Sequence, residues 1–429
     1  MKFRFVHAAD LHLDTPFSGV GRTDAAVATA LRDASLDAWD DLVSCTLRER
    51  AALLVLAGDI YDGPDRGLRP QMRLLSGLRR LVGQGVRVVM VHGNHDPLGT
   101  GWSAVRDWPA GVTICGSDGV ASTVVERDGH RLATVYGVSH ARADEGRNLA
   151  RLLRRGPEPG LHLGVVHCSV GADPEHAAYA PCSLDDLRAG GMDYWALGHV
   201  HRRRTLLAGD PCYACYPGNL QGRSLAPGER GAKGALVVEC DDVHGVIAPP
   251  RFVPLDRVRF LPMELDAADW PDVAAATQGV LAGLTALRAA PEHEGRGLVV
   301  RVFLRGVPAA DPSWQAAAAD LRTQVLEGVA GWTPFVWCES VRLGLRVVLD
   351  RAAIAGRGDF AAELVAHATA LAADPAALEA LLAEIDAGLP AGIAAVAREV
   401  APSVASPAAL VEEAEAHCLR LLLAEGVAP

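Results

Sequence analysis

Five short segments of this sequence place metal-capable side chains directly after an apolar run. The residues that follow these runs are Asp10 and His12, Asp59, Asn94 and His95, His167, and His199 and His201. Apolar runs such as LLVLAG and VRVVMVHG are typical of buried strands. In open α/β sheets, the loops at the carboxyl ends of the strands converge at one edge. We therefore expect these residues, which are far apart in the sequence, to meet at one centre.

The spacing within two of the segments also favours a shared centre. In D-L-H and H-V-H the polar residues are two apart, and residues i and i+2 of an extended chain point to the same side. Gly58, Gly93 and Gly198 come just before the polar residues. Glycine allows tight turns and close backbone approach, so these positions predict a closely packed site.

The residue types indicate which metals such a site would take. Carboxylate, amide and imidazole ligands without cysteine suit Mn²⁺, Fe²⁺ or Zn²⁺ better than Ca²⁺ or Cu⁺. The candidates are too many for one ion and fit two: Asp10, His12, Asp59, Asn94, His167, His199 and His201. Two metals roughly 3.5–4 Å apart commonly serve in-line displacement at phosphorus. The set therefore predicts a two-metal phosphoester hydrolase.

The elements that must position these residues are readable in the first 250 residues. Residues 24–50 are expected to form a helix before the strand LLVLAGD, and Pro70 is expected to open a second helix that ends near Gly83. Later runs such as RLATVYGV and KGALVVEC form strand–strand patterns. Strand–helix alternation followed by hairpins predicts an α/β sandwich with mixed sheets.

Two further regions follow. A Pro-rich, extended stretch around residues 249–262 predicts a domain junction, and helix and strand patterns then alternate in a smaller α/β unit. From about residue 351 the chain is Ala/Leu-rich and helical, with Pro407 at the start of the last helix. The predicted domains are 1–250, 251–350 and 351–429.

The order of the motifs adds a resemblance. D-x-H, G-D-x-x-D, G-N-H-D, an isolated His after a strand, and G-H-x-H span residues 10–201 and together resemble the calcineurin-like metallophosphoesterase superfamily. The resemblance implies a β-sandwich flanked by helices and two bound metals. It implies Asp10, His12 and His201 at the first metal, Asp59 as the bridge, and Asn94, His167 and His199 at the second. His95 would be the catalytic histidine, oriented by Asp96, and Asp62 would support His95 or its loop.

Other stretches resemble one branch of that superfamily. HAADLHLD, GDIYDGPDRGLRP and YPGNLQGRS are similar to the SbcD-like DNA repair exonuclease family, in particular its YhaO-type bacterial branch. Protein phosphatases carry G-D-x-x-D-R-G and G-N-H-E, which this chain lacks. The resemblance implies DNA as substrate and a cap formed by the smaller α/β unit. It also implies C-terminal helices that dock on an SbcC-type coiled-coil ATPase, and a homodimer.

The support for DNA and for the ATPase from the residues themselves is modest. Arg202, Arg203 and Arg204 follow the last ligand and could contact phosphates, or could be a solvated turn. The net charge of −11 argues against a large basic surface. The last helix carries an apolar stripe that suits a partner or its own chain equally: Leu410, Val411, Ala414, Cys418, Leu421 and Leu422. Alternatives are a phosphodiesterase or phosphatase of small nucleotides, and a non-catalytic scaffold.

The composition indicates the cellular compartment in which we expect this protein. Nine scattered cysteines do not form an obvious disulfide framework, and the single C-x-x-C at Cys212 and Cys215 is weak evidence for zinc. No apolar run approaches the ~20 residues of a membrane span. The N-terminal segment does not have the pattern of a signal peptide. We expect a cytoplasmic protein without a membrane partner, with Mn²⁺ preferred and Fe²⁺, Zn²⁺ or Mg²⁺ as alternatives.

Overall fold

The computed structural model describes residues 1–15, 25–63, 66–99, 103–171, 178–209, 212–308, 312–346, 351–388 and 407–424. The chain divides into two compact units. The first holds residues 1–263, 278–302 and 322–340, and the second holds residues 264–277, 303–321 and 341–429. This division runs through the middle α/β stretch, so the three domains predicted from the sequence stay a prediction.

The first sheet carries three of the predicted strand ends. Its strands lie in the order β12-β11-β1-β2-β3-β4, with β13 also paired to β11. Strands β1 to β4 are parallel, whereas β11 runs antiparallel to β1. Their bounds are β1 Lys2–Ala8, β2 Leu53–Ala57, β3 Arg87–Val91, β4 Val112–Ile114, β11 Gly234–Asp241, β12 Gly245–Val246 and β13 Arg251–Pro254.

The second sheet carries the other two strand ends. Its order is β5-β6-β7-β8-β10-β9, in which β6, β7, β8 and β10 are parallel and the edge strands β5 and β9 are antiparallel to their neighbours. The bounds are β5 Ala121–Arg127, β6 His130–Val138, β7 Leu161–His167, β8 Tyr194–Gly198, β9 Arg204–Ala208 and β10 Tyr213–Tyr216.

The two sheets pack face to face because alternate residues of each strand point to opposite faces. Phe5, Leu53 and Val55 of the first sheet lie in one buried cluster with Val135 and Val165 of the second. Since both faces of the central strands are covered, runs such as LLVLA are apolar throughout. The predicted α/β sandwich with mixed sheets is confirmed.

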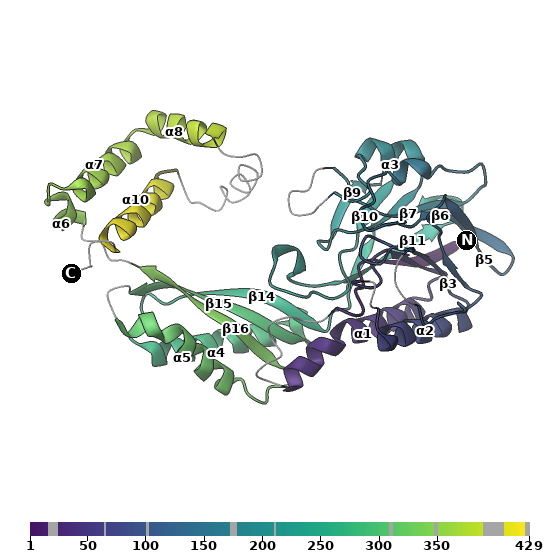
Figure 1. Ribbon diagram of the computed structural model, residues 1–429, viewed down its shortest axis with the longest axis horizontal. Coiled ribbons are helices and arrows are strands. Elements are labelled where there is room, and N and C mark those ends of the chain that lie inside the picture. Colours follow the sequence, from purple (N-terminus) through teal and green to yellow (C-terminus); the bar gives the residue numbers. More distant parts are fainter. Residues whose placement is uncertain are drawn as a thin grey trace. The chain divides into compact units, whose positions relative to one another are not determined.

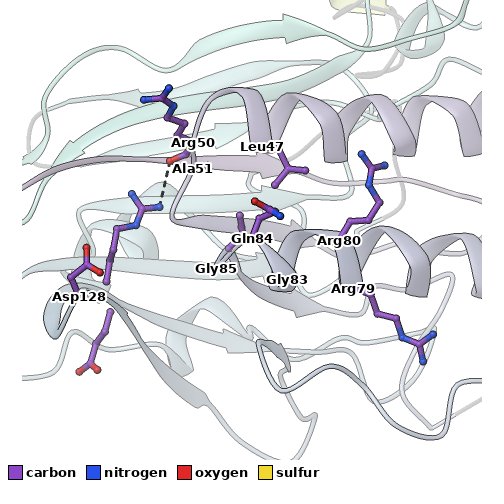
Figure 2. Close-up of a pocket in the computed structure, with 12 residues that line it drawn as sticks. Leu47, Arg50, Ala51, Arg79, Arg80, Gly83, Gln84, Gly85 and Asp128 are labelled. Atoms are coloured by element: carbon purple, nitrogen blue, oxygen red, sulfur yellow. Dashed lines mark hydrogen bonds between the residues drawn. The ribbon is translucent and has the colours of Figure 1, made fainter.

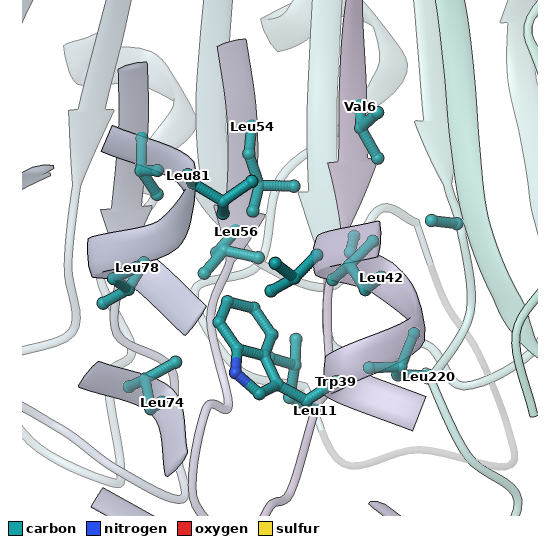
Figure 3. Packing of buried hydrophobic residues seen from close by; sticks show 14 of the residues in the cluster. Val6, Leu11, Trp39, Leu42, Leu54, Leu56, Leu74, Leu78, Leu81 and Leu220 are labelled. Atoms are coloured by element: carbon teal, nitrogen blue, oxygen red, sulfur yellow. The ribbon is translucent and has the colours of Figure 1, made fainter. Parts of the chain in front are cut away.

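Helices cover the outer faces (Figure 1). Helices α1, Ala25–Arg48, and α2, Leu68–Gly83, pack on the first sheet, and α3, Leu184–Gly190, covers the second. Figure 3 shows Trp39 of α1 among Leu74 and Leu78 of α2 and Leu56 of β2. Helix α2 begins two residues before Pro70, which stands in the first turn, where its missing N–H needs no partner.

The rest of the chain holds a third sheet and the C-terminal helices. The strands β14 Val258–Asp266, β15 Gly297–Pro308 and β16 Val336–Arg346 lie in that order. The same stretch holds helices α4 Val273–Ala289 and α5 Pro312–Gly328, and the helices that follow are α6 Arg351–Ala355, α7 Phe360–Ala373, α8 Pro375–Gly388 and α10 Pro407–Ala424. The single-turn 3₁₀ helices are η1 Ala150–Leu152, η2 Pro227–Glu229 and η3 Pro291–His293.

None of the helices in the described ranges combines the length and the apolar character that crossing a bilayer requires.

Candidate metal centre

The five strand ends meet at one edge of the sandwich. Asp10 follows β1 and Asp59 follows β2, and the backbone N–H of Asp10 donates to the carbonyl of Gly58 at 3.0 Å. His167 ends β7, and its Nδ1 donates to the carbonyl of Ala57 at 3.0 Å. These contacts join the carboxyl ends of both sheets, as expected for parallel strands whose loops converge.

A first ligand group consists of Asp10, His12 and His201, whose ligand atoms lie within 4.8 Å of one another. The Nε2 atoms of His12 and His201 are 3.2 Å apart. The two residues of the D-L-H segment thus lie close together, beside the second histidine of H-V-H.

A second ligand group consists of Asp10, Asp59 and His167, again within 4.8 Å. His167 Nε2 lies 2.9 Å from Asn94 Oδ1 and 3.3 Å from Asp59 Oδ2. The same Asp59 oxygen lies 3.8 Å from His12 Nε2, so Asp59 stands between the two groups. His199 lies beside them, with its ring centroid 5.4 Å from that of His167.

The close approach of ligand side chains at one position and of the backbone at another explains two of the glycines. A Cβ at Gly93 would lie 2.2 Å from Asp59 Oδ1, and a Cβ at Gly198 would lie 1.8 Å from the carbonyl oxygen of Ala57. A side chain at Gly93 would displace the side chains of Asp59 and His167, and one at Gly198 would push away the end of β2. Glycine at these positions allows the ligand groups to be compact.

Four of the metal-capable residues have a positive φ, a conformation that is uncommon for residues other than glycine. They are Asp10 at 53°, His12 at 44°, Asp59 at 50° and His199 at 104°. Such conformations cost on the order of 1–3 kcal/mol each and persist where the surrounding structure fixes them. The packed strand ends hold these side chains in place before any ligand binds.

The charges of the site fit a divalent cation. Asp10 and Asp59 are each 1% exposed, and within the described ranges neither forms an ion pair with a lysine or arginine. Burial raises the pKa of Asp10. Burial lowers the pKa of the His167 imidazole, but Asp59 outweighs this and raises that pKa to about 9. Without a metal, a proton on His167 supplies positive charge beside Asp59. A bound metal would supply that charge in its place, because a histidine must lose this proton to bind a metal.

His95 stands at the exposed side of the ligand groups. Its backbone N–H donates to Asp59 Oδ1 at 3.0 Å, and its Nδ1 lies 3.2 Å from the carbonyl oxygen of Asp62. Because a carbonyl only accepts, Nδ1 carries a proton and Nε2 is the atom available for proton transfer. The side chain is 41% exposed, so a substrate can reach it.

The expectation that Asp96 orients the His95 ring is wrong. The buried Asp96 carboxylate accepts from the backbone N–H groups of Ile60 and Gly93 and pairs with His92 Nδ1 at 2.9 Å, and within the described ranges it has no bond to His95. Asp96 therefore fixes the turn that carries His95. The side chain that faces the ring is Asp62, with Oδ1 3.3 Å from His95 Nδ1.

The predicted arginines and the arginine found near the ligands are different residues. Arg202, Arg203 and Arg204 are exposed, and the Arg203 guanidinium lies over the Phe252 ring, 4.1 Å from its centroid. Arg223 instead approaches the centre, with Nη1 2.9 Å from Asp62 Oδ1.

Glu229 and Asn219, which the sequence patterns did not indicate, lie behind His201. Glu229 Oε1 accepts from His201 Nδ1 at 2.6 Å, and Asn219 Nδ2 donates to Glu229 Oε2 at 2.7 Å. These residues follow the YPG stretch and do not end an apolar strand, so the strand-end pattern could not find them. The available signal was YPGNLQGRS itself, which includes Asn219 and Arg223.

A separate hollow of about 930 Å³ lies elsewhere on the first unit (Figure 2). Its lining includes Ala51 and Val86, which precede β2 and β3, so it is at the strand edge opposite the ligand groups. Arg80, which also lines it, stands in the last turn of α2, where a cation offsets the helix dipole.

The buried Cys212 and Cys215 belong to none of the candidate metal groups found among the described residues.

Comparison with known families agrees with this geometry. Residues 3–203 match the family model described as Calcineurin-like phosphoesterase. The chain carries a calcineurin-like phosphoesterase domain. Residues 260–346 match the family model described as Metallophosphoesterase YhaO, middle domain, which agrees with the resemblance to the YhaO-type branch.

Two curated relatives match about half of this chain. "Uncharacterized metallophosphoesterase YhaO" of Bacillus subtilis is 36% identical over 234 residues, which are 54% of this chain and 56% of the relative. "DNA double-strand break repair protein Mre11" of Aeropyrum pernix is 27% identical over 234 residues, 51% of this chain and 53% of the relative. The matched stretch thus spans only about half the length of these relatives.

Proposed function

We propose that this metallophosphoesterase is a two-metal phosphodiesterase that hydrolyses DNA, as an exonuclease subunit that acts in DNA repair. The observation that carries the proposal is the pair of ligand groups that share Asp10, with His95 beside them. The relative named as a DNA double-strand break repair protein supports DNA over smaller substrates.

The residues present fit two divalent ions, with Mn²⁺ preferred. Asp10, His12 and His201 would hold one ion, Asn94, His167 and His199 the other, and Asp59 would bridge them. Such ions activate a water molecule and neutralise charge on the phosphate oxygens. His95 in its imidazolium form would give its Nε2 proton to the oxygen that leaves, or would stabilise the charge on that oxygen, while the Asp62 carbonyl accepts from Nδ1–H. The exposed Arg202–Arg204 segment would contact phosphates along the DNA.

The proposed partner is an SbcC-type coiled-coil ATPase. Part of the apolar stripe of α10 packs on its own chain, because Val411 is buried against Ala368 and Leu378. Leu410 and Leu422 of the same helix are each 38% exposed, which leaves apolar surface for a partner helix.

A homodimer is proposed on the resemblance alone. All nine cysteines are free thiols, which supports a reducing, cytoplasmic setting.

The test uses the purified chain with Mn²⁺, end-labelled duplex DNA, and bis-p-nitrophenyl phosphate as a small diester. We expect shortening of the DNA that depends on Mn²⁺ and falls about 100-fold or more in His95→Ala, since a positioned general acid contributes about 10²–10⁴-fold. His244→Ala is the matched control, because His244 is an exposed histidine paired with Asp241 away from the strand ends.

The assay also separates the rival functions. Hydrolysis of the small diester alone, with and without an SbcC-type ATPase, would overturn the DNA proposal in favour of a nucleotide phosphodiesterase. No hydrolysis of either substrate by protein that binds two Mn²⁺ would favour a scaffold. Near-normal rates in His95→Ala would refute the role given to His95.

A further inference from the structure

Glu229 holds a position that the strand-end motifs do not explain. It ends the short helix η2, is 9% exposed, and lies outside residues 3–203 that match the phosphoesterase family. Its Oε1 is 2.6 Å from His201 Nδ1. Its Oε2 accepts from Asn219 Nδ2 at 2.7 Å and from the backbone N–H of Arg223 at 3.0 Å. Both carboxylate oxygens are therefore engaged.

These contacts determine which nitrogen of His201 carries the proton. An ionised carboxylate only accepts hydrogen bonds, so Nδ1 of His201 must donate. In the neutral ring, Nε2 then presents its lone pair, and this atom lies 3.2 Å from Nε2 of His12. Two imidazole nitrogens that face each other at this distance are suited to share a cation.

We propose that Glu229 is a positioning residue, which fixes His201 with its Nε2 lone pair directed at the first metal position. Carboxylates that accept from the outer nitrogen of a ligating histidine set its tautomer and raise its basicity, and their loss typically lowers metal affinity about 10- to 100-fold. This inference rests on the two-metal site of the proposed function, but it concerns binding of the metal and not the reaction.

Arg223 connects Glu229 to the second histidine of the first ligand group. Its Nη2 lies 3.6 Å from Glu229 Oε1, and its Nη1 lies 2.9 Å from Asp62 Oδ1. Asp62 Oδ1 is in turn 2.9 Å from His12 Nδ1. One guanidinium thus stands between the two carboxylates that face the outer nitrogens of His12 and His201.

The surroundings of Glu229 explain why glutamine would not replace it. In Glu229→Gln, two fixed donors, from Asn219 and Arg223, hold the amide oxygen at the place of Oε2. The amide NH₂ then faces His201 Nδ1, so this ring nitrogen must accept a hydrogen bond from the amide. The ring proton moves to Nε2, and the lone pair is lost from the metal side.

The test measures Mn²⁺ binding by electron paramagnetic resonance and calorimetry, without substrate. We expect Glu229→Gln to keep one Mn²⁺ at wild-type affinity and to bind the other about 10- to 100-fold more weakly. The control is Glu415→Gln, which alters another buried glutamate, paired with Arg351 in the C-terminal helices. Binding of both ions by Glu229→Gln within twofold of wild type would overturn the proposal.

A second measurement needs no variant and does not depend on folding of the mutant. In ¹⁵N-histidine spectra of Zn²⁺-loaded wild-type protein, His201 should show a protonated Nδ1 and a metal-bound Nε2. A protonated Nε2 at His201 would contradict the proposal. If DNA hydrolysis fails while both metal readouts behave as expected, only the proposed substrate is wrong.

Discussion

Arg223 Nη1 lies 2.9 Å from Asp62 Oδ1, although 161 residues separate them in the chain. The same oxygen lies 2.9 Å from His12 Nδ1 and 3.3 Å from His95 Nδ1. The Asp62 carboxylate therefore contacts three groups: the candidate metal ligand His12, the proposed catalytic residue His95, and the guanidinium of Arg223. Burial raises the pKa of Asp62, but His12 and Arg223 outweigh this and hold that pKa well below its ordinary value, so Asp62 is ionised near neutral pH.

Asp62→Asn should lower hydrolysis of bis-p-nitrophenyl phosphate by roughly 10-fold or more, because a charge-assisted contact is about twice as strong as a neutral one. Among the described residues, the Arg223 guanidinium would then keep only its contacts to Glu229 and Thr15. The rate is measured at saturating Mn²⁺, so that weaker metal binding does not contribute. Asp41→Asn is the control, since Asp41 pairs with Arg257 on the first unit. An unchanged rate in Asp62→Asn would mean that Asp62 only supports its loop.

Gly93→Ala should weaken Mn²⁺ binding and lower the free energy of unfolding by about 1–3 kcal/mol, the usual cost of overpacking. The new methyl group would meet Asp59 Oδ1 at 2.2 Å and His167 ring carbons at 2.8 Å. Metal titration and urea unfolding give the two quantities. Gly83→Ala is a matched control, because a Cβ at Gly83 meets no atom within 4 Å. Equal losses in both variants would show that packing at Gly93 is not the cause.

Mn²⁺ should raise the unfolding temperature of the metal-free protein, and a chelator should reverse the rise. A divalent cation would be held between the buried carboxylates of Asp10 and Asp59, and a ligand at 100 times its dissociation constant stabilises by about 2.7 kcal/mol. Thermal unfolding is followed by circular dichroism with increasing Mn²⁺. His201→Ala should show a smaller rise than wild type. A temperature that does not change with Mn²⁺ would contradict a metal site at these residues.

Glu145 gives a pH dependence that does not involve the metal ligands. Arg147 bonds both of its carboxylate oxygens and holds the pKa of Glu145 at about 2, against an ordinary value of 4.5. Because the folded pKa is the lower one, the stabilisation is present above about pH 4.5 and is lost as the pH falls towards 2. Urea unfolding of wild type and Glu145→Gln should differ most at neutral pH and converge near pH 2. A constant difference would refute this assignment.

The sequence predicted the strand ends well because two strong signals coincide there. An apolar run before Asp59 or His167 indicates a buried strand, and a polar residue at its end must reach the sheet edge. The fold class followed from the same alternation and is confirmed. The individual roles of the site residues stay predictions, although the structure brings their side chains together.

The remaining parts of the site depend on tertiary contacts that carry no local pattern. Glu229 lies 28 positions after His201, beyond β9 and β10, and nothing in its neighbours distinguishes it from a surface glutamate. The family resemblance implied that Asp96 orients His95, yet the Asp96 side chain points away from the His95 ring. Its partners are the backbone of Ile60 and Gly93 and the ring of His92.

Strand β11 has a consequence for how this domain can be shortened. The match to the phosphoesterase family ends at residue 203, but β11, residues 234–241, supplies the antiparallel neighbour of β1. A chain cut at residue 203 would leave β1 with a bare edge of unpaired N–H and C=O groups, which is a template for pairing with another molecule. Self-association of such a fragment would report a severed sheet and not a natural assembly surface.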